Sequence, residues 1–107
     1  MNWTFEFASD VAIAEAAALP PELRAKLNRF AKLIVAHGLG AMREPYAKHL
    51  EGKLWELRLK GRTGIARSLY VTVTGQRVVV VRTYVKKTQK TPRREIELAL
   101  ARAKEIR

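Results

Sequence analysis

The chain has 107 residues, no cysteine and a formal net charge of +11. This length accommodates one domain, so residues 1–107 are expected to form a single domain. The lack of cysteine excludes disulfides and thiolate metal sites, and no apolar run reaches the roughly 18 residues that a membrane span needs. The polar and aromatic start does not resemble a secretory signal, so a reducing, cytoplasmic location is expected.

Hydrophobic periodicity predicts one strand and two helices in the first part of the chain. The alternating segment Asn2–Phe7 is expected to form a half-buried strand. An Ala-rich helix follows, which begins near Val11 and ends before Pro20, because the residue before a proline avoids helical geometry. A second helix begins at Pro21 and ends at Gly38, and the two helices are expected to form a hairpin over one face of a sheet.

The second part predicts a three-stranded meander and a last helix. The segment Gly40–Gly52 is expected to be irregular, and short turns between the strands after it indicate antiparallel neighbours. A basic linker, Lys86–Lys90, leads to a helix that Thr91 caps and that runs from Pro92 to about Ile106. The order β-α-α-β-β-β-α predicts an α+β fold with a small antiparallel sheet. The three meander strands are expected at Leu54–Lys60, Ile65–Val73 and Arg77–Val85.

Basic residues are concentrated in the second part of the chain. Residues 1–42 hold 4 Lys/Arg and 4 Asp/Glu, whereas residues 43–107 hold 17 Lys/Arg and 6 Asp/Glu. Between Leu57 and Arg94 there are 11 basic residues and no acidic one. Such a field attracts polyanions, which favours an RNA or nucleoprotein partner, although an acidic protein would respond to the same field.

Strand parity gathers much of this charge on one face of the predicted sheet. If Trp55 and the valines of the last strand pack under the helices, the residues of opposite parity converge on an open face. Arg67 has the parity of apolar neighbours on the middle strand, so a bulge or the end of the sheet would be needed to expose it. The residues expected on the open face are Arg58, Lys60, Arg82, Tyr84 and Lys86.

A face of this kind could bind phosphates, stack a base on Tyr84, and cleave RNA. Cleavage by the 2′-hydroxyl needs a proton acceptor, a proton donor and stabilisation of the phosphate charge. A Lys or Tyr whose pKa is lowered by cationic neighbours could accept the proton. The sequence holds no Gly-rich phosphate loop, histidine pair or aspartate cluster, so no metal and no cofactor are expected. A solvated face that only binds is an equally open alternative.

Four segments carry a family pattern: Leu54–Arg58, Ala66–Tyr70, Tyr84–Pro92 with its Lys-Lys-Thr-Gln-Lys-Thr-Pro run, and Glu95–Ile96. With them, the sequence resembles the RelE/ParE toxin superfamily, and within it the HigB-like, phage-derived branch. The resemblance implies a RelE-like toxin, without cofactor, that cleaves mRNA in the ribosomal A site. It also implies a cognate antitoxin, commonly a helix-turn-helix protein.

The resemblance also implies roles for individual residues. The branch often has a histidine where this chain has Arg82, and arginine is a poor general base because it stays protonated. This departure keeps open a non-catalytic module that binds antitoxin or RNA, and a ParE-like poison of DNA gyrase is a further alternative with the same fold. Strand parity and the resemblance together give the expected site. The catalytic residues are Arg67, Arg82, Tyr84 and Lys86, and the RNA-binding residues are Arg58, Lys60, Lys87 and Lys90.

Overall fold

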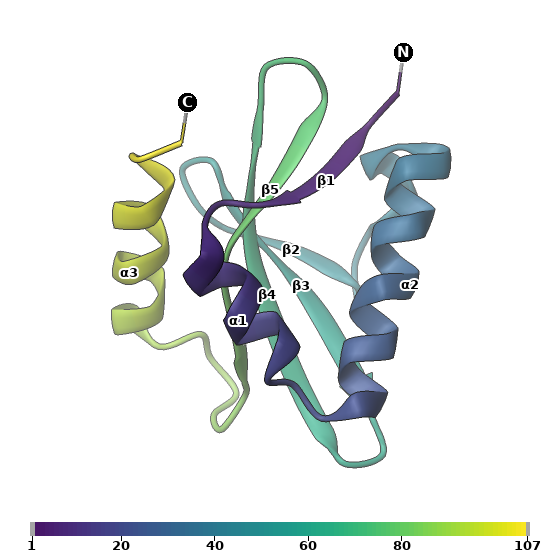
Figure 1. Ribbon diagram of the computed structural model, residues 1–107. Coiled ribbons are helices and arrows are strands. Elements are labelled where there is room, and N and C mark those ends of the chain that lie inside the picture. Colours follow the sequence, from purple (N-terminus) through teal and green to yellow (C-terminus); the bar gives the residue numbers. More distant parts are fainter. Residues whose placement is uncertain (1, 107) are drawn as a thin grey trace.

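The computed structural model describes residues 2–106 and shows a five-stranded sheet with helices on both faces (Figure 1). A single 3-10 turn, Leu39–Ala41, follows the second helix. Within the described residues, no helix is long and apolar enough to span a bilayer. The elements are β1 (Thr4–Phe7), α1 (Asp10–Ala17), α2 (Pro21–His37), β2 (Ala47–Glu51), β3 (Leu54–Gly61), β4 (Gly64–Val73), β5 (Arg77–Val85) and α3 (Arg93–Ala103).

The sheet has the strand order β1-β5-β4-β3-β2. Strands β3, β4 and β5 form the expected antiparallel meander. The sheet is nevertheless mixed, because β1 runs parallel to β5 at its edge. At the opposite edge, β2 pairs with β3 within the segment Gly40–Gly52 that was expected to be irregular. The sheet is therefore wider than predicted, and both additional pairings lie at its edges.

The helices end close to the predicted positions. Ser9 caps α1 by accepting a hydrogen bond from the backbone N–H of Ala12 at 3.2 Å. Gly38 follows α2 with a φ of 83°, a backbone conformation that favours glycine. The last helix is shorter than predicted, since it ends at Ala103, and the expected cap is wrong. Thr91 instead donates its hydroxyl hydrogen bond to Glu56 on β3.

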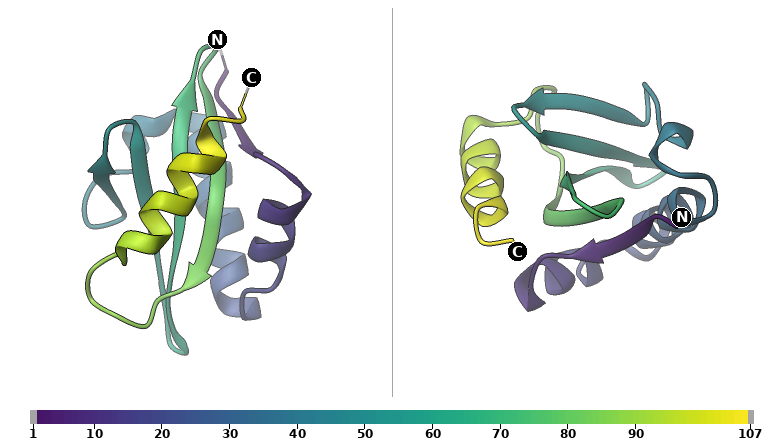
Figure 2. Two further views of the ribbon diagram at one scale, coloured as in Figure 1. Left: turned by 90° about the vertical axis from the view of Figure 1, so that its left-hand side faces the viewer. Right: turned by 90° about the horizontal axis from the view of Figure 1, so that it is seen from above.

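Two apolar cores lie on opposite faces of the sheet. Helices α1 and α2 cover one face and α3 covers the other (Figure 2). The run Val78–Val81 is buried on both sides, because Val78 and Val80 face the first core and Val79 and Val81 face the second. Trp55, expected in the core, is 39% exposed and packs against the ring of His49 on β2 at 5.2 Å. The prediction for Trp55 was wrong because a neighbouring edge strand, and not a helix, covers it.

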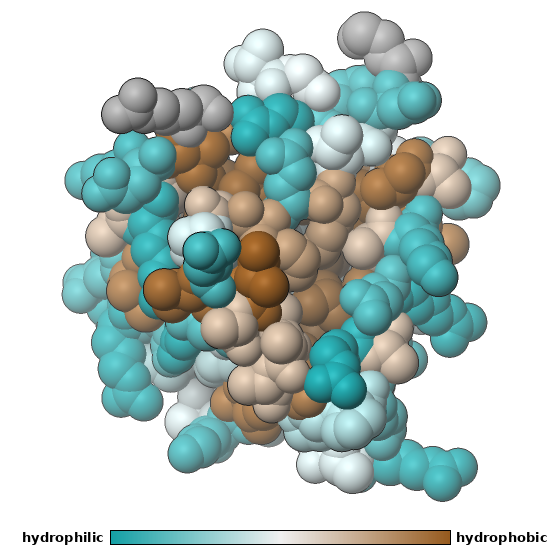
Figure 3. Space-filling model, viewed as in Figure 1, coloured by the Kyte–Doolittle hydropathy of each residue, from teal (hydrophilic) through white to brown (hydrophobic). Residues whose placement is uncertain are grey.

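The outer surface of α1 is unusually apolar for a surface helix. Apolar side chains gather in the middle of the view in Figure 3, over α1. Val11 and Ile13 on this helix are exposed by 55% and 50%. A helix that is apolar around its circumference is usually covered on all sides. The surface of α1 is therefore a candidate contact for a protein partner.

Candidate functional site

A row of three side chains crosses the α3 face of the sheet. Arg58 of β3 lies opposite Arg67 of β4, which in turn lies opposite Tyr84 of β5. Directly opposed residues of antiparallel strands share a face, so these three side chains point to the same side of the sheet.

A β-bulge in β5 produces this alignment. Leu69 pairs with Arg82 whereas the next residue, Tyr70, pairs with Val80, so Val81 has no partner in the register. The extra residue reverses the parity of β5 beyond that point. Arg82 therefore lies on the same face as Val79 and Val81, and not opposite them as predicted. The bulge also places Arg67 on the same face as Arg82 and Tyr84. This face is not open as predicted, because α3 covers it, and the bulge does not expose Arg67.

Glu56 is the centre of the ion pairs at one end of this row. Its carboxylate is buried and accepts hydrogen bonds from Arg58 Nε at 3.1 Å and from the Thr91 hydroxyl at 2.6 Å. Arg67 Nε lies 3.6 Å from the same carboxylate. One buried acid thus holds two of the predicted arginines and the start of the last helix, as expected for a buried carboxylate that needs partners.

Arg67 is only 1% exposed, although it lies among the predicted site residues. Its Nη2 donates a hydrogen bond to the backbone oxygen of Gln89, in the segment between β5 and α3. Arg67 Nη1 is buried and has no hydrogen-bond partner within residues 2–106. A buried guanidinium with an unused N–H is costly to keep, which is a common feature of sites that await a ligand.

A cavity of about 310 Å³ brings four predicted residues together beside this segment. No carboxylate is among the residues that line it. Glu56 pairs with Arg58 and Arg67 from outside this lining, whereas neither Lys60 nor Lys86 has an ion pair with an acid within residues 2–106. Two lysines beside two arginines that share one carboxylate leave a net positive charge, which attracts anionic groups. The lining residues are Arg58, Lys60, Arg67 and Lys86 from the predicted set, with Pro45, Tyr46, Ile65 and Gln89.

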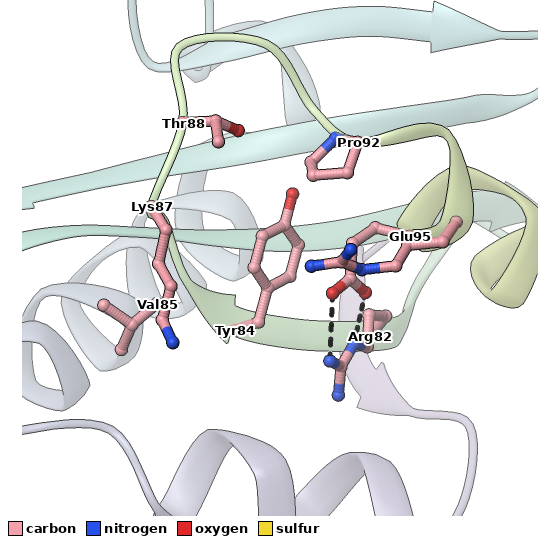
Figure 4. Close-up of a pocket in the computed structure, with 8 residues that line it drawn as sticks. Arg82, Tyr84, Val85, Lys87, Thr88, Pro92 and Glu95 are labelled. Carbon is pink, nitrogen blue, oxygen red and sulfur yellow. Dashed lines mark hydrogen bonds and ion pairs between the residues drawn. The ribbon is translucent and has the colours of Figure 1, made fainter.

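A second cavity of about 310 Å³ lies on the other side of the segment and holds Arg82, Tyr84 and Lys87 (Figure 4). Arg82 is engaged here in a bidentate ion pair, with Nε and Nη2 donating to the two oxygens of Glu95 at 2.7 and 3.1 Å. Its Nη1 donates to Glu15 of α1 at 2.7 Å. The two carboxylates raise the pKa of Arg82 above its usual range, chiefly through the hydrogen bonds that Arg82 donates to Glu95. Arg82 thus joins α1, β5 and α3.

Tyr84 lies between these groups with its hydroxyl pointing toward the segment that ends at Pro92 (Figure 4). The guanidinium of Arg82 lies 5.5 Å from the centre of its ring. Burial raises the pKa of the Tyr84 phenol, and the neighbouring Arg67 opposes this only in part. The prediction that cationic neighbours lower the pKa of a tyrosine here was wrong. The neutral phenol is suited to donate a proton rather than to accept one.

Lys90 lies in a third, smaller cavity of about 240 Å³ that Arg58, Arg67 and Gln89 also line. The predicted residues therefore fall into three adjoining hollows around the segment from Lys86 to Thr91. Lys48 and His49 of β2 join them in this third hollow.

Comparison with known proteins shows to which family the chain belongs. The sequence profile described as phage derived protein Gp49-like (DUF891) matches residues 14–104. The chain belongs to this Gp49-like family. No match was found among curated proteins.

A solved structure with the same fold is the E. coli toxin RelE, in a form with two arginines replaced by alanine and in the free state. It covers 100% of both chains with a TM-score of 0.62 at 20% sequence identity. The likeness establishes the RelE fold for this Gp49-like protein. This fold is the one that the resemblance to the RelE/ParE superfamily implies.

Tyr46, Lys48, His49 and Gln89 line these cavities and were not predicted from the sequence. Tyr46 and Gln89 lie outside regular strands and helices, where parity gives no information about direction. His49 lies on β2, the strand that was not predicted. Its Nε2 lies 2.7 Å from the Gly52 carbonyl oxygen. Among residues 2–106, no three His, Asp or Glu side chains converge as a metal site would need.

Proposed function

We propose that this Gp49-like protein is the toxin of a type II toxin–antitoxin pair, in the HigB-like branch, and that it cleaves mRNA in the ribosomal A site. The observation that carries the proposal is the cavity that four cationic side chains line, with Glu56 paired to only two of them. The four are Arg58, Lys60, Arg67 and Lys86. Such a cavity fits a phosphodiester with its flanking phosphates. Because the substrate is ribosome-bound message, we place the activity in the cytoplasm.

In the proposed reaction, the 2′-hydroxyl of the nucleotide attacks the adjacent phosphorus and the 5′-oxygen of the next nucleotide leaves. The products are a 2′,3′-cyclic phosphate and a 5′-hydroxyl end. Arg67 offers its unused Nη1 hydrogen to the phosphate oxygens, and Arg58 and Lys86 balance the charge that develops there. Electrostatic stabilisation of this kind is commonly the largest contribution to such a rate.

The two proton transfers fall to different residues in this proposal. The Tyr84 phenol, which burial keeps protonated, donates to the leaving 5′-oxygen. A lysine of these cavities, in its neutral form, accepts the proton of the 2′-hydroxyl; Lys86 and Lys90 are the predicted lysines beside the arginines. Arg82 positions Tyr84 through its contact with the ring and its ion pair with Glu95.

The proposal requires the segment from Lys86 to Thr91 to move when RNA binds. In the free protein the Gln89 carbonyl oxygen occupies the place on Arg67 where a phosphate oxygen would bind. Four of the residues in this segment are exposed, from Lys87 to Lys90, and none lies in a strand or helix. Such a segment can be displaced at a low cost in free energy.

A cognate antitoxin is the expected protein partner, and a helix-turn-helix protein is the kind that we propose. The cation-lined cavity fits an acidic antitoxin segment, which would exclude RNA by occupying the same groups. The exposed apolar side chains of α1 supply a second surface of the kind that protein partners cover.

Induced expression of the chain alone in a bacterial host tests the proposal. We expect growth and pulse-labelled protein synthesis to stop while DNA synthesis continues, and new mRNA 5′ ends to appear. Lys86→Ala should relieve the arrest, and Lys32→Ala, a matched control on the exposed surface of α2, should not. Arrest of DNA synthesis first would indicate a ParE-like gyrase poison.

The non-catalytic module is the second candidate. One observation favours it: the Gln89 carbonyl covers Arg67, and Glu15 and Glu95 engage Arg82, so neither guanidinium is free in this conformation. Normal growth with soluble, folded protein that still binds an antitoxin would establish this second function and exclude the nuclease.

A further inference from the structure

Tyr46 is an aromatic side chain that the proposed chemistry does not use. It lies just before β2 and is 51% exposed, which is high for a tyrosine in a small domain. Its ring packs edge-on against Phe30 of α2, with ring centres 5.7 Å apart. The ring therefore packs against Phe30 on one side and is open to solvent on the other.

The backbone fixes Tyr46 beside the predicted phosphate-binding residues. The N–H of Arg58 donates to the carbonyl oxygen of Tyr46 at 2.8 Å, which ties the turn before β2 directly to β3. Tyr46 lines the same 310 Å³ cavity as Arg58, Lys60 and Lys86. A rigid, half-exposed ring and a group of cations thus share one hollow.

Tyr84, the residue first expected to stack a base, is less suited to that role. The Arg82 guanidinium lies over its ring at 5.5 Å, and its hydroxyl is buried. Tyr84 also lines the second cavity, whereas Lys60 and Lys86 line the first. The aromatic surface next to the cluster of cations therefore comes from Tyr46.

We infer that Tyr46 is the stacking surface for a nucleobase of single-stranded RNA whose adjacent phosphate is bound by Arg58, Lys60 and Lys86. The inference rests on the proposed function, since it names a subsite for the same RNA. Stacking on an aromatic ring beside cationic side chains is a general mode of single-strand binding and tolerates any base. It supplies contact without hydrogen-bond readout, so the subsite positions the strand and does not select its sequence.

Binding of a fluorescent RNA oligonucleotide to the full chain tests the inference. Tyr46→Ala should weaken binding about 10-fold, whereas Tyr46→Phe and Tyr46→Trp should stay within about 2-fold, because stacking needs the ring and not the hydroxyl. The dependence of the affinity on salt should not change in Tyr46→Ala, since no phosphate contact is lost. Trp55→Ala is the matched control, because Trp55 is also an exposed aromatic but lines none of the cavities described above.

A second measurement does not depend on a variant that folds. Photo-crosslinking of a 4-thiouridine oligonucleotide to the unaltered chain, followed by peptide mass spectrometry, should place the adduct on Tyr46. RNA binding with an adduct elsewhere, and with equal affinities for Tyr46→Ala and Tyr46→Phe, would overturn the inference and leave the proposed function standing.

Two other outcomes would reject the inference for different reasons. If the unaltered, folded chain binds no RNA oligonucleotide, the inference fails, and cleavage on purified ribosomes decides the proposed function separately. If Tyr46→Ala weakens the binding of polyglutamate and leaves RNA binding unchanged, the hollow belongs to an acidic polypeptide and not to a nucleobase.

Discussion

The hydroxyl of Tyr84 lies beside the guanidinium of Arg67, from opposed positions on β5 and β4, and this neighbour opposes part of the rise in the pKa of the phenol. Neither the hydroxyl nor Arg67 Nη1 has any other hydrogen-bond partner within residues 2–106. Buried polar atoms without partners reduce stability by about 1–3 kcal/mol each. Two such atoms at adjacent positions indicate a site that is optimised for a ligand and not for the free protein.

Tyr84→Phe separates catalysis from stability. Removal of a buried hydroxyl that has no partner other than Arg67 within residues 2–106 should leave the free energy of unfolding unchanged or raise it by about 1 kcal/mol. Cleavage should fall by about 100-fold, because the proposed proton donor is lost. Urea denaturation and a single-turnover cleavage assay measure the two effects. Unchanged cleavage by the folded variant would remove Tyr84 from the mechanism.

The pair Glu56–Arg67 is expected to behave as one unit. Loss of either partner leaves the other charge buried, so Glu56→Gln and Arg67→Met should each cost about 3 kcal/mol. The double variant should cost less than the two together, with a coupling energy of about 1–3 kcal/mol in denaturation experiments. Additive losses would contradict this pairing. The exposed carboxylate variant Glu105→Gln is the control and should change stability by less than about 0.5 kcal/mol.

Replacement of Arg82 should reduce mainly stability, whereas replacement of Lys86 should reduce mainly cleavage. Arg82→Ala removes the ion pairs to Glu15 and Glu95 and should cost about 2 kcal/mol of stability, with a loosened α3. Lys86→Ala should leave the melting temperature almost unchanged, because within residues 2–106 the ammonium group makes only a long hydrogen bond, 3.4 Å, to Gln89 Oε1. It should abolish cleavage, because the cavity loses a charge that the proposal places beside the phosphate. A stable but inactive Arg82→Ala would instead indicate direct contact of Arg82 with RNA.

Much of this fold could be predicted from the sequence, because alternation and helix caps are local signals. Two features could not be. The edge strand β2 has the sequence Ala-Lys-His-Leu-Glu, in which only two side chains are apolar, so it lacks the alternation of a half-buried strand. The pairing of β1 with β5 joins segments that are far apart in the chain, and no local pattern encodes it.

The bulge in β5 explains why the site was only partly predicted. The run Val78–Val81 is apolar at every position, so it contains no alternation in which a change of parity could be seen. Side chains were consequently expected to alternate between the two faces without interruption along the whole of β5. The basic face was still predicted, because the bulge lies before Arg82. Arg82 and Tyr84 therefore share a face with each other, as do Arg58 and Lys60 on β3.

Stability should decrease at low pH through the ion pair that joins β1 to β5. The hydrogen bonds from Arg77, and then from Thr4, lower the pKa of Glu6 from 4.5 to about 2. Since the folded-state pKa is below the unfolded one, the stabilisation is fully present above pH 4.5 and is lost as the pH falls toward 2. About a third of each side chain is exposed, so the effect should stay below about 1 kcal/mol.

Thermal unfolding between pH 2 and pH 5 measures this effect, with Glu6→Gln as the comparison. The variant should be less stable than the unaltered chain above pH 4.5, and the difference should vanish near pH 2. A difference that stays constant over this range would show that Glu6 acts through packing and not through its charge.

Cleavage of a defined message on purified ribosomes tests the central claim most directly. The full chain is added to ribosomes that hold a known codon in the A site, and primer extension maps the new ends. We expect a cut within the A-site codon that Lys32→Ala retains and Lys86→Ala loses. Intact message in the presence of folded protein that binds the ribosome would contradict it.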